Sequence, residues 1–282
     1  MPEGDTVFRA ADTLHRALAG RIVTSFRTVL VQLARVDEDA PVAGRTVERV
    51  VSRGKHLLMH FSGDLILRTH MRMHGSWHVY RPGERWQRPA LDMRIVVATS
   101  AFEAVAFTVP VAEFRTAETL ARDPVIRFLG PDLAARTFDL QDAVARVRAA
   151  GPQRIADVLL QQRIVAGIGN ALKSEALFEA GLSPFALVPA LDSAAIERLV
   201  SVARRQMQMN TEVGERPLLA GRGGRRTTRS ANPDAQLWVY GRGGLPCRRC
   251  GHPIAVDKSG EDARLTYYCP RCQADGSGYM GP

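Results

Sequence analysis

No stretch of this 282-residue sequence is long and apolar enough to cross a membrane, because none approaches the ~18 apolar residues that a spanning helix needs. The amino-terminal segment also lacks the apolar core of a secretion signal, since Glu3, Asp5 and Arg9 interrupt it. Internal repeats are absent as well. We therefore expect a cytoplasmic, monomeric protein with no membrane partner, and the length suits two domains.

Acidic residues are scarce relative to basic ones. The chain has 38 Lys and Arg against 29 Asp and Glu, which gives a formal net charge of +9 and an isoelectric point near 10.0. A surplus of this size attracts polyanions, so nucleic acid is the partner that we expect first. The alternative is an arginine-rich composition that reflects codon usage and has no functional meaning.

Cysteine is also rare, and all four cysteines lie near the end of the chain. Cys247, Cys250, Cys269 and Cys272 form two C-x-x-C pairs with 18 residues between them (251–268). This spacing is typical of a zinc site, in which each pair presents two thiolates from one tight turn. Two disulfides are the alternative, and a reducing cytoplasm argues against them. His252 could replace one ligand, but with four cysteines present we expect it at the surface.

The first half of the chain reads as one helix followed by strands. Apolar residues recur at helical spacing between residues 5 and 19, and Gly20 is placed to end that helix. Short β-rich runs follow without a helix between them, which indicates an antiparallel sandwich or barrel. These runs cover residues 21–30, 46–52, 56–61, 64–70, 76–80, 93–99 and 104–111.

The second half reads as mainly helical. Turn residues at 122–140 mark a boundary, Gly181 is suited to end one helix, and Asp192 or Ser193 is suited to cap another. We expect helices over 139–149, 153–162, 171–180 and 192–209. Residues 214–235 read as a mobile basic loop, residues 236–244 (QLWVYGRGG) as a strand entering the cysteine-bearing hairpin, and the tail as disordered.

The opening residues MPEG contain a candidate nucleophile and a candidate acid. Methionine before proline is normally removed, which leaves Pro2 with a free secondary amine of pKa about 7.7–8.0, against about 10.4 for a lysine side chain. The helix that follows should lower this value further. Such an amine can attack an electrophilic carbon, with Glu3 beside it as a general acid. Taken alone, the dipeptide is more simply a maturation signal.

Four motifs occur in order along the chain: MPEG at residues 1–4, SRGKHLL at 52–58, GIGN at 167–170 and RLTYYCPRC at 264–272. As a set they resemble the formamidopyrimidine-DNA glycosylase/endonuclease VIII family, from Pro2 to about Cys272. The resemblance implies an α+β multidomain fold: an N-terminal helix plus antiparallel β-sandwich, then a helix–two-turn–helix domain with a C-terminal β-hairpin zinc finger. The expected domains are 1–130, 131–236 and 237–275, followed by a flexible tail at 276–282.

The resemblance also implies a reaction. In this family the N-terminal proline attacks the anomeric carbon of a damaged nucleotide flipped out of the duplex, and a Schiff base and β,δ-elimination follow. Pro2 matches that nucleophile, Glu3 the acid that protonates the sugar-ring oxygen, and Lys55 the hairpin lysine that contacts phosphate and assists base loss. On the residues alone, Lys55 would be a solvated lysine at a strand end.

Further positions match the family's DNA contacts. Gly167 and Gly169 would let backbone N–H groups approach a phosphate, Asn170 matches a phosphate-binding asparagine, and Arg264 matches the arginine that grips the phosphates beside the lesion. Without the resemblance, GIGN is an ordinary inter-helix turn and Arg264 a surface arginine. The four cysteines imply one structural zinc ion and no redox cofactor.

A loop in THMRMHGSW matches the segment that fills the space left by the flipped base. Arg72, Met73 and His74 occupy the three void-filling positions, and no counterpart is evident for the Arg-x-Phe pair that formamidopyrimidine enzymes place on a later loop. This favours the endonuclease VIII branch, in its actinobacterial second form, although Asp5-Thr6 and His74 depart from that branch's usual residues. The bland alternative is that Met73 packs in the core and its neighbours are solvated.

We therefore expect a bifunctional glycosylase and AP lyase that removes oxidised bases, pyrimidines above all, from duplex DNA. Single-strand preference stays open. The protein would associate with the nucleoid when bound. A non-catalytic protein of the same fold that senses damage or nicks is the rival, since it would keep Lys55, Asn170, Arg264 and zinc without needing a free Pro2. A zinc-finger transcription regulator is a weaker option, because no recognition helix accompanies the finger.

Overall fold

The computed structural model describes residues 2–211, 224–228, 230, 232–259 and 264–274. The described chain forms two compact units, one ending at Phe128 and the other beginning at Leu129. Within these residues no helix has both the length and the apolar character to span a membrane. The predicted basic loop lies partly, and the predicted disordered tail largely, outside the described residues.

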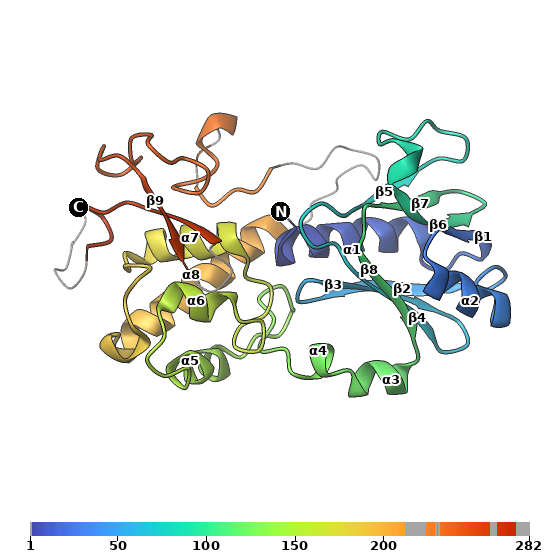
Figure 1. Ribbon diagram of the computed structural model, residues 1–282, viewed down its shortest axis with the longest axis horizontal. Helices are drawn as coiled ribbons and strands as arrows, with labels where there is room; N and C mark the ends of the chain where they lie inside the picture. The colour runs from blue at the N-terminus through green and yellow to red at the C-terminus, as the bar shows by residue number, and fades with distance from the viewer. Residues whose placement is uncertain (1, 212–223, 229, 231, 260–263, 275–282) are drawn as a thin grey trace. The chain divides into compact units, whose positions relative to one another are not determined.

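The first unit is a β-sandwich with one long helix packed along it (Figure 1). Helix α1 (Gly4–Leu18) buries its apolar face against β2, β3 and β5, which confirms the predicted first helix. One antiparallel sheet has the order β1-β6-β7-β5 and the other β2-β3-β4-β8. Their strands are β1 (Val23–Thr28), β2 (Val47–Arg53), β3 (His56–Phe61), β4 (Leu65–His70), β5 (Ser76–Tyr80), β6 (Met93–Thr99), β7 (Glu103–Phe107) and β8 (Val111–Arg115).

Alternation along β3 and β4 separates a face that packs into the core from a mixed face, which carries Leu58 and Ile66 beside polar residues. Leu57, Met59 and Phe61 point into the core between the sheets, where almost no part of them is exposed. The residues between them face the other way, and His56 pairs with His70 across the two strands. The pairing puts the β2–β3 turn and the end of β4 at the same edge of the sheet, which becomes important for the candidate site.

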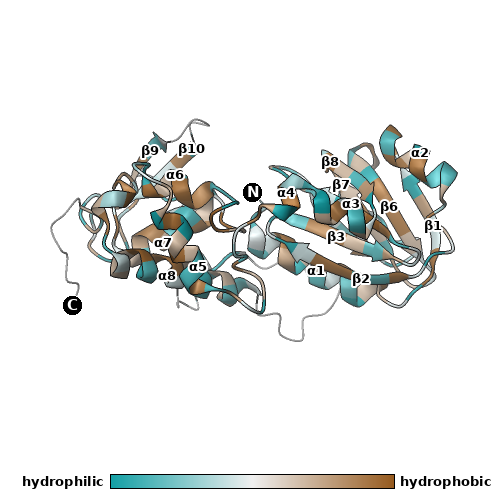
Figure 2. Ribbon diagram, turned by 90° about the horizontal axis from the view of Figure 1, so that it is seen from below, coloured by the Kyte–Doolittle hydropathy of each residue, from teal (hydrophilic) through white to brown (hydrophobic). Residues whose placement is uncertain are grey.

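The expectation that no helix interrupts the strands is wrong. Helix α2 (Val31–Asp39) lies between β1 and β2, and α3 (Ala117–Arg122) and α4 (Pro124–Arg127) follow β8. Among the described residues of α2 Leu33 alone is fully buried and Val36 packs partly buried against the core, so the apolar stripe is too short for periodicity to reveal. The predicted run 104–111 is also two strands, because Thr108 (φ 51°) and Pro110 separate β7 from β8. In Figure 2, brown predominates along β6, whereas α3 shows both teal and brown.

The second unit contains the predicted helices: α5 (Leu140–Arg148), α6 (Ile155–Leu160), α7 (Asn170–Ala180) and α8 (Ser193–Thr211). Gly181 ends α7 in the left-handed conformation (φ 70°), and Asp192 accepts a hydrogen bond from the Ala195 amide at 2.6 Å at the start of α8, both as expected. Short 3-10 turns lie at Val188–Ala190 and Pro233–Ala235 in this unit, and another lies at Ala90–Asp92 in the first unit. Helix α7 is buried along almost its whole length, unlike the amphipathic α5 and α8.

The chain then forms an antiparallel hairpin of β9 (Ala255–Ser259) and β10 (Arg264–Tyr268). The prediction of a strand at 236–244 is wrong, since these residues, all of them described, form turns. The cause is a side chain on α7. The buried Glu175 carboxylate accepts hydrogen bonds from the backbone amides of Trp238 (2.7 Å), Val239 (2.8 Å) and Tyr240 (2.7 Å). Three consecutive amides that converge on one carboxylate cannot also form a strand ladder.

Glu175 has no exposed surface, and the Thr227 hydroxyl also donates to it. Burial raises the pKa of this carboxyl, while the hydrogen bonds from Thr227 and the three amides oppose the shift. A buried carboxylate on α7 therefore sets the path of the chain as it enters the cysteine-bearing hairpin.

Replacing this acceptor should destabilise the second unit. Glu175→Ala leaves buried donors without an acceptor, and each unpaired donor costs about 1–3 kcal/mol. We therefore expect a loss of about 3–5 kcal/mol in the free energy of unfolding. Urea denaturation measures the loss, and hydrogen exchange at residues 238–240 should rise with it. Exposed Glu197 on α8 is the control, and Glu197→Ala should change stability by about 0.5 kcal/mol or less. Equal stabilities of the two variants would contradict this role for Glu175.

Candidate active site and nucleic-acid interface

Pro2 and Glu3 lie at the amino-terminal end of α1. Pro2 is half-buried, and Glu3 is the residue before the helix, with extended backbone and only 1% of its surface exposed. Within the described residues, the Glu3 side chain makes no capping bond to the helix, although its carbonyl accepts the Val7 amide at 2.9 Å. Asp5 instead supplies a negative charge at the positive amino-terminal end of the helix. It accepts the Thr6 amide at 2.8 Å and lies 3.9 Å from Arg9. The residue that follows Pro2 therefore carries a buried carboxyl that the helix does not use as a cap.

Lys55 lies in the tight turn between β2 and β3. Gly54 precedes it in the left-handed conformation (φ 57°), and Lys55 itself is half-buried. Its positive charge helps to lower the pKa of His70, the last residue of β4. The hairpin turn that carries Lys55 and the loop that leaves β4 are thus electrostatic neighbours at one edge of the first unit.

The three residues assigned to void filling all project from the loop between β4 and β5. Arg72 and His74 are exposed, and Met73 is 57% exposed, so the alternative that Met73 packs in the core is wrong. Met71 occupies the core instead, because it continues the inward alternation of β4 and has only 1% of its surface exposed. The structure therefore presents Arg72, Met73 and His74 together on one anchored loop.

Contacts on both sides fix that loop. The His70 Nδ1 accepts the Arg72 amide at 3.1 Å, and the Gly75 amide donates to the Met71 carbonyl at 2.9 Å. Arg88, which sequence reasoning missed, donates from Nη1 to the His74 carbonyl at 3.2 Å and from Nη2 to Asp92 at 3.0 Å. No local pattern could identify Arg88, because it lies 14 residues beyond the loop carbonyl that it holds.

Two histidines beneath the loop are kept neutral. Burial lowers the pKa of His56 to about 3, with help from His70 and Arg68. Burial lowers that of His70 to about 4, with help from Arg72, Lys55 and Arg68. The rings meet edge to face with centroids 4.8 Å apart. At neutral pH the positive charge at this edge therefore belongs to Lys55 and the arginines, and the histidines act as neutral hydrogen-bonding groups.

In the second unit, the GIGN turn leads into α7, but only part of it matches the expectation. The Gly167 amide donates to Gln162 Oε1 at 3.0 Å, so this N–H is already held within the protein. Gln162 also donates from Nε2 to the carbonyls of Leu160 and Ile168, each at 3.0 Å. Sequence reasoning missed Gln162, which supports the turn. The sequence-based expectation that the Gly167 N–H is available to a phosphate does not agree with this bond. Gly169 is the residue directly before α7 and has an extended backbone.

Asn170 and Arg264 are brought together by the packing of β10 on α7. Asn170 donates from Nδ2 to the carbonyl of Leu265, the residue after Arg264, at 2.5 Å. Among the described residues nothing bonds to its buried carbonyl oxygen. Deeper in the same seam, the fully buried Lys173 donates from Nζ to Thr266 Oγ1 at 2.8 Å. A lysine inside a helix–hairpin seam is a second feature that the sequence pattern did not indicate.

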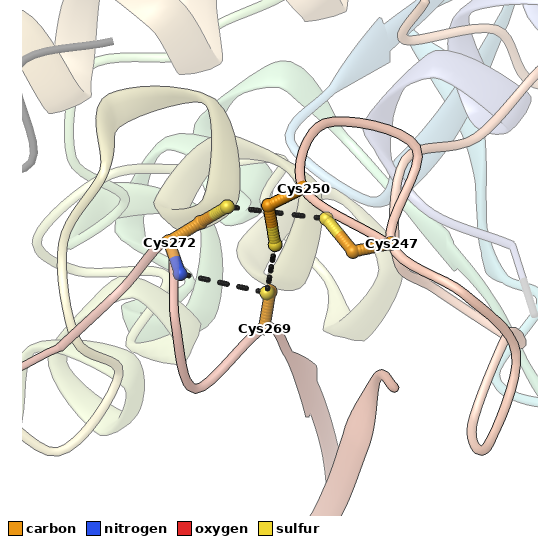
Figure 3. Close-up of side chains that lie close together, drawn as sticks. All are labelled: Cys247, Cys250, Cys269 and Cys272. Atoms are coloured by element: carbon orange, nitrogen blue, oxygen red, sulfur yellow. Dashed lines mark hydrogen bonds between the residues drawn. The ribbon is translucent and has the colours of Figure 1, made fainter. Parts of the chain in front are cut away.

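The four cysteines form one compact cluster (Figure 3). Their sulfur atoms all lie within 4.8 Å of one another, with 3.9 Å between Cys247 and Cys272 and 3.5 Å between Cys250 and Cys269. A tetrahedral zinc ion with Zn–S bonds of about 2.3 Å separates its sulfurs by about 3.8 Å. All four residues are free cysteines, and His252 is exposed and outside the cluster. The cluster fits one structural zinc ion, and the predicted disulfide alternative is wrong.

Three family profiles match the chain in order. They are the formamidopyrimidine-DNA glycosylase N-terminal domain over residues 1–110, the formamidopyrimidine-DNA glycosylase H2TH domain over 129–218, and the zinc finger found in FPG and IleRS over 244–274. A "Probable endonuclease 8 2" of Streptomyces coelicolor is 41% identical over 278 residues, which covers 97% of this chain and 94% of that protein. The chain belongs to the formamidopyrimidine-DNA glycosylase/endonuclease VIII family.

Other relatives specify the branch. "Endonuclease 8 2" of Mycobacterium tuberculosis is 39% identical, with 97% of this chain and all of that protein covered. "DNA-(apurinic or apyrimidinic site) lyase Nei2" of Mycolicibacterium smegmatis is 35% identical over 97% of this chain and 99% of its own length. The predicted membership in the second-form endonuclease VIII branch is confirmed. The predicted fold is confirmed too, since a DNA complex of Lactococcus lactis Fpg superimposes with a TM-score of 0.81 at 22% identity, covering 97% of this chain and 100% of that one.

Removal of the zinc ion should affect the folding of the cysteine-bearing hairpin and leave the first unit folded. A small hairpin with four thiolates has little core of its own, so its folding should depend on the ion. We expect about one zinc per chain by metal analysis. Cys250→Ser or a strong chelator should abolish protease resistance of residues 244–274 while the sandwich keeps its melting transition. A metal-free preparation whose finger resists protease as well as the untreated protein would overturn the assignment.

Proposed function

We propose that this family member is a bifunctional DNA glycosylase and AP lyase of base excision repair that removes oxidised bases, with pyrimidines favoured. The observation that carries the proposal is the pairing of an N-terminal proline with the buried Glu3 carboxyl, which does not cap its helix. Relatives over 97% of the chain are named endonuclease 8 and DNA-(apurinic or apyrimidinic site) lyase, which supports both halves of the activity.

Pro2 is the nucleophile in this proposal, once Met1 has been removed. About a tenth of an α-amine with pKa near 8 is neutral at pH 7 and able to attack. Its nitrogen bonds to the anomeric carbon of the flipped nucleotide as the glycosidic bond breaks, and the base leaves with a proton. Glu3 protonates the sugar-ring oxygen, so the ring opens to an iminium. β- and δ-elimination then break the C–O bonds to the two flanking phosphates.

Phosphate contacts hold the strand for this step. Lys55 in the first unit, and Asn170, Gly169 and Arg264 in the second, are the groups that we assign to the backbone around the lesion. The planar guanidinium of Arg264 suits bidentate binding of one phosphate. The surplus of basic residues, +9 over the whole chain, supports a polyanionic partner of this kind.

The exposed loop residues Arg72, Met73 and His74 are assigned to the space that base flipping opens in the duplex. Met73 is flexible and polarizable and suits an irregular gap between bases, while Arg72 can donate hydrogen bonds to the unpaired opposite base. All three positions come from one loop, as in the endonuclease VIII branch, and this supports our proposal that oxidised pyrimidines are favoured.

Borohydride trapping on abasic DNA tests the chemistry. The mature protein, with removal of Met1 checked by intact mass, should form a trapped covalent complex. A form that carries extra residues before Pro2 should form none, and Pro2→Gly should retain partial activity because it keeps a terminal amine. Complete trapping by the blocked form would assign the nucleophile to a lysine. DNA binding with no trapping by the mature protein would favour the rival, a non-catalytic damage sensor.

Two neighbouring methionines provide a matched test of the void-filling loop. Met73→Ala should slow base excision from duplex DNA about tenfold or more, since unstacking a base costs a few kcal/mol and each 1.4 kcal/mol is tenfold in rate. Cleavage at a preformed abasic site in single-stranded DNA should hardly change, because there is no stack to replace.

The buried Met71 is the control. Met71→Ala should lower the free energy of unfolding by about 2–5 kcal/mol, whereas Met73→Ala should leave the melting temperature nearly unchanged. Equal losses on both DNA substrates for Met73→Ala would show that the loop does not enter the duplex.

A further inference from the structure

The loop that carries Arg72, Met73 and His74 depends on an unusual backbone conformation. Arg72 has φ 49°, in the left-handed region that a side chain as large as arginine rarely adopts. Gly75 closes the turn by donating to the Met71 carbonyl at 2.9 Å. Something must favour the left-handed state of Arg72, since a free loop would relax to the right-handed one and redirect all three exposed side chains.

His70 supplies that preference through a side-chain acceptor. Its Nδ1 accepts the amide hydrogen of Arg72, two residues further on, at 3.1 Å. Asn and Asp side chains commonly make the same two-residue bond in Asx-turns and tolerate left-handed backbone there. The imidazole can accept only while Nδ1 carries no proton, so the proton of the neutral ring must lie on Nε2.

The surroundings of His70 keep its ring neutral. Lys55 from the β2–β3 turn, Arg68 from β4 and Arg72 from the loop all place positive charge near it. From β3, the His56 ring meets it edge-on at 4.8 Å, and from β8 it faces Val111, which does not titrate. Asp123 raises the pKa of His56, but burial and the cations outweigh it. Burial first, and then the cations, lower the pKa of His70 to about 4.

We infer that His70 is a positioning residue: as a neutral hydrogen-bond acceptor it holds Arg72 left-handed and so directs Arg72, Met73 and His74 into the duplex. The inference rests on the proposed function, because it assumes that this loop fills the space left by the flipped base. It predicts a residue that never touches DNA yet controls excision from duplex, and not cleavage of single strands.

Two substitutions separate the acceptor from the bulk of the ring. His70→Leu keeps apolar volume and removes the acceptor, whereas His70→Asn restores an oxygen suited to an Asx-turn. His60→Leu is the matched control. His60 is a half-buried histidine of β3 on the face of the sheet that also carries His70, and its contact is with Arg49 at 3.2 Å, away from the loop.

The first readout does not require activity. Hydrogen exchange in a peptide that covers residues 71–75 should become at least tenfold faster in His70→Leu, while His70→Asn and His60→Leu should resemble the parent protein. Unchanged exchange in His70→Leu would overturn the inference even if the protein had no enzymatic activity. A parent protein that cleaves neither substrate would instead defeat the proposed function and leave the exchange result standing.

The second readout is the split between substrates. His70→Leu should slow single-turnover excision from duplex DNA about tenfold and leave cleavage of a single-stranded abasic site within about twofold, and His70→Asn should recover most of the duplex rate. Equal losses on both substrates, or failure of His70→Asn to recover, would mean that the ring only supports the fold.

The third readout is pH. With a pKa of about 4, His70 in the folded protein is almost entirely neutral at pH 6 and about half protonated at pH 4. Between pH 6 and pH 4 the duplex rate of the parent should therefore fall relative to that of His70→Asn, whose acceptor does not titrate. Parallel pH profiles for the two proteins would contradict a role for the neutral ring.

Discussion

Glu175 carries a carboxylate with no exposed surface, and three consecutive amides of residues 238–240 converge on it. The cysteine-bearing hairpin has few apolar residues of its own, and its small core is completed by Phe178 from α7. The same helix begins with Asn170, which binds the backbone of β10, and continues with Lys173, which reaches Thr266. One buried helix thus determines where the hairpin lies and where Arg264, the first residue of β10, emerges. The interface residues of this unit depend on polar bonds that sit well below the surface.

In the first unit, strand register determines where the candidate site residues lie. The pairing of His56 with His70 brings the Lys55 turn and the Arg72–His74 loop to one edge of a sheet, although they lie well apart in sequence. A shift of one residue between β3 and β4 would turn Met59 and Leu67 outward, and the hydrophobic core prevents it. The core therefore sets the geometry of residues that are themselves exposed.

The sequence predicted those parts of the fold whose causes are local. The helices of the second unit followed from periodicity and from the residues at their ends, Gly181 and Asp192, and the zinc cluster followed from cysteine spacing. Helix α2 could not be found in this way, because Leu33 is its one buried residue among those described. Residues 236–244 have the apolar content of a strand, but the decisive partner, Glu175, is more than 60 residues away. Arg88 was missed for the same reason, because only the folded chain brings it to the His74 carbonyl. The partners of Gln162 lie within six residues of it, but a glutamine has no turn preference that would indicate such bonds.

Gly75 limits how this loop can change. A Cβ atom built there would lie 2.5 Å from the Met71 carbonyl oxygen, and that oxygen already accepts the Gly75 amide. Met71 is in turn fixed in the core, so both ends of the loop are immovable and the span between them holds three residues. Inserting or deleting a residue would break the closing bond or pull Met71 from its place. Natural or engineered variation in how this protein meets its substrate is thereby confined to the chemistry of three side chains, at constant loop length.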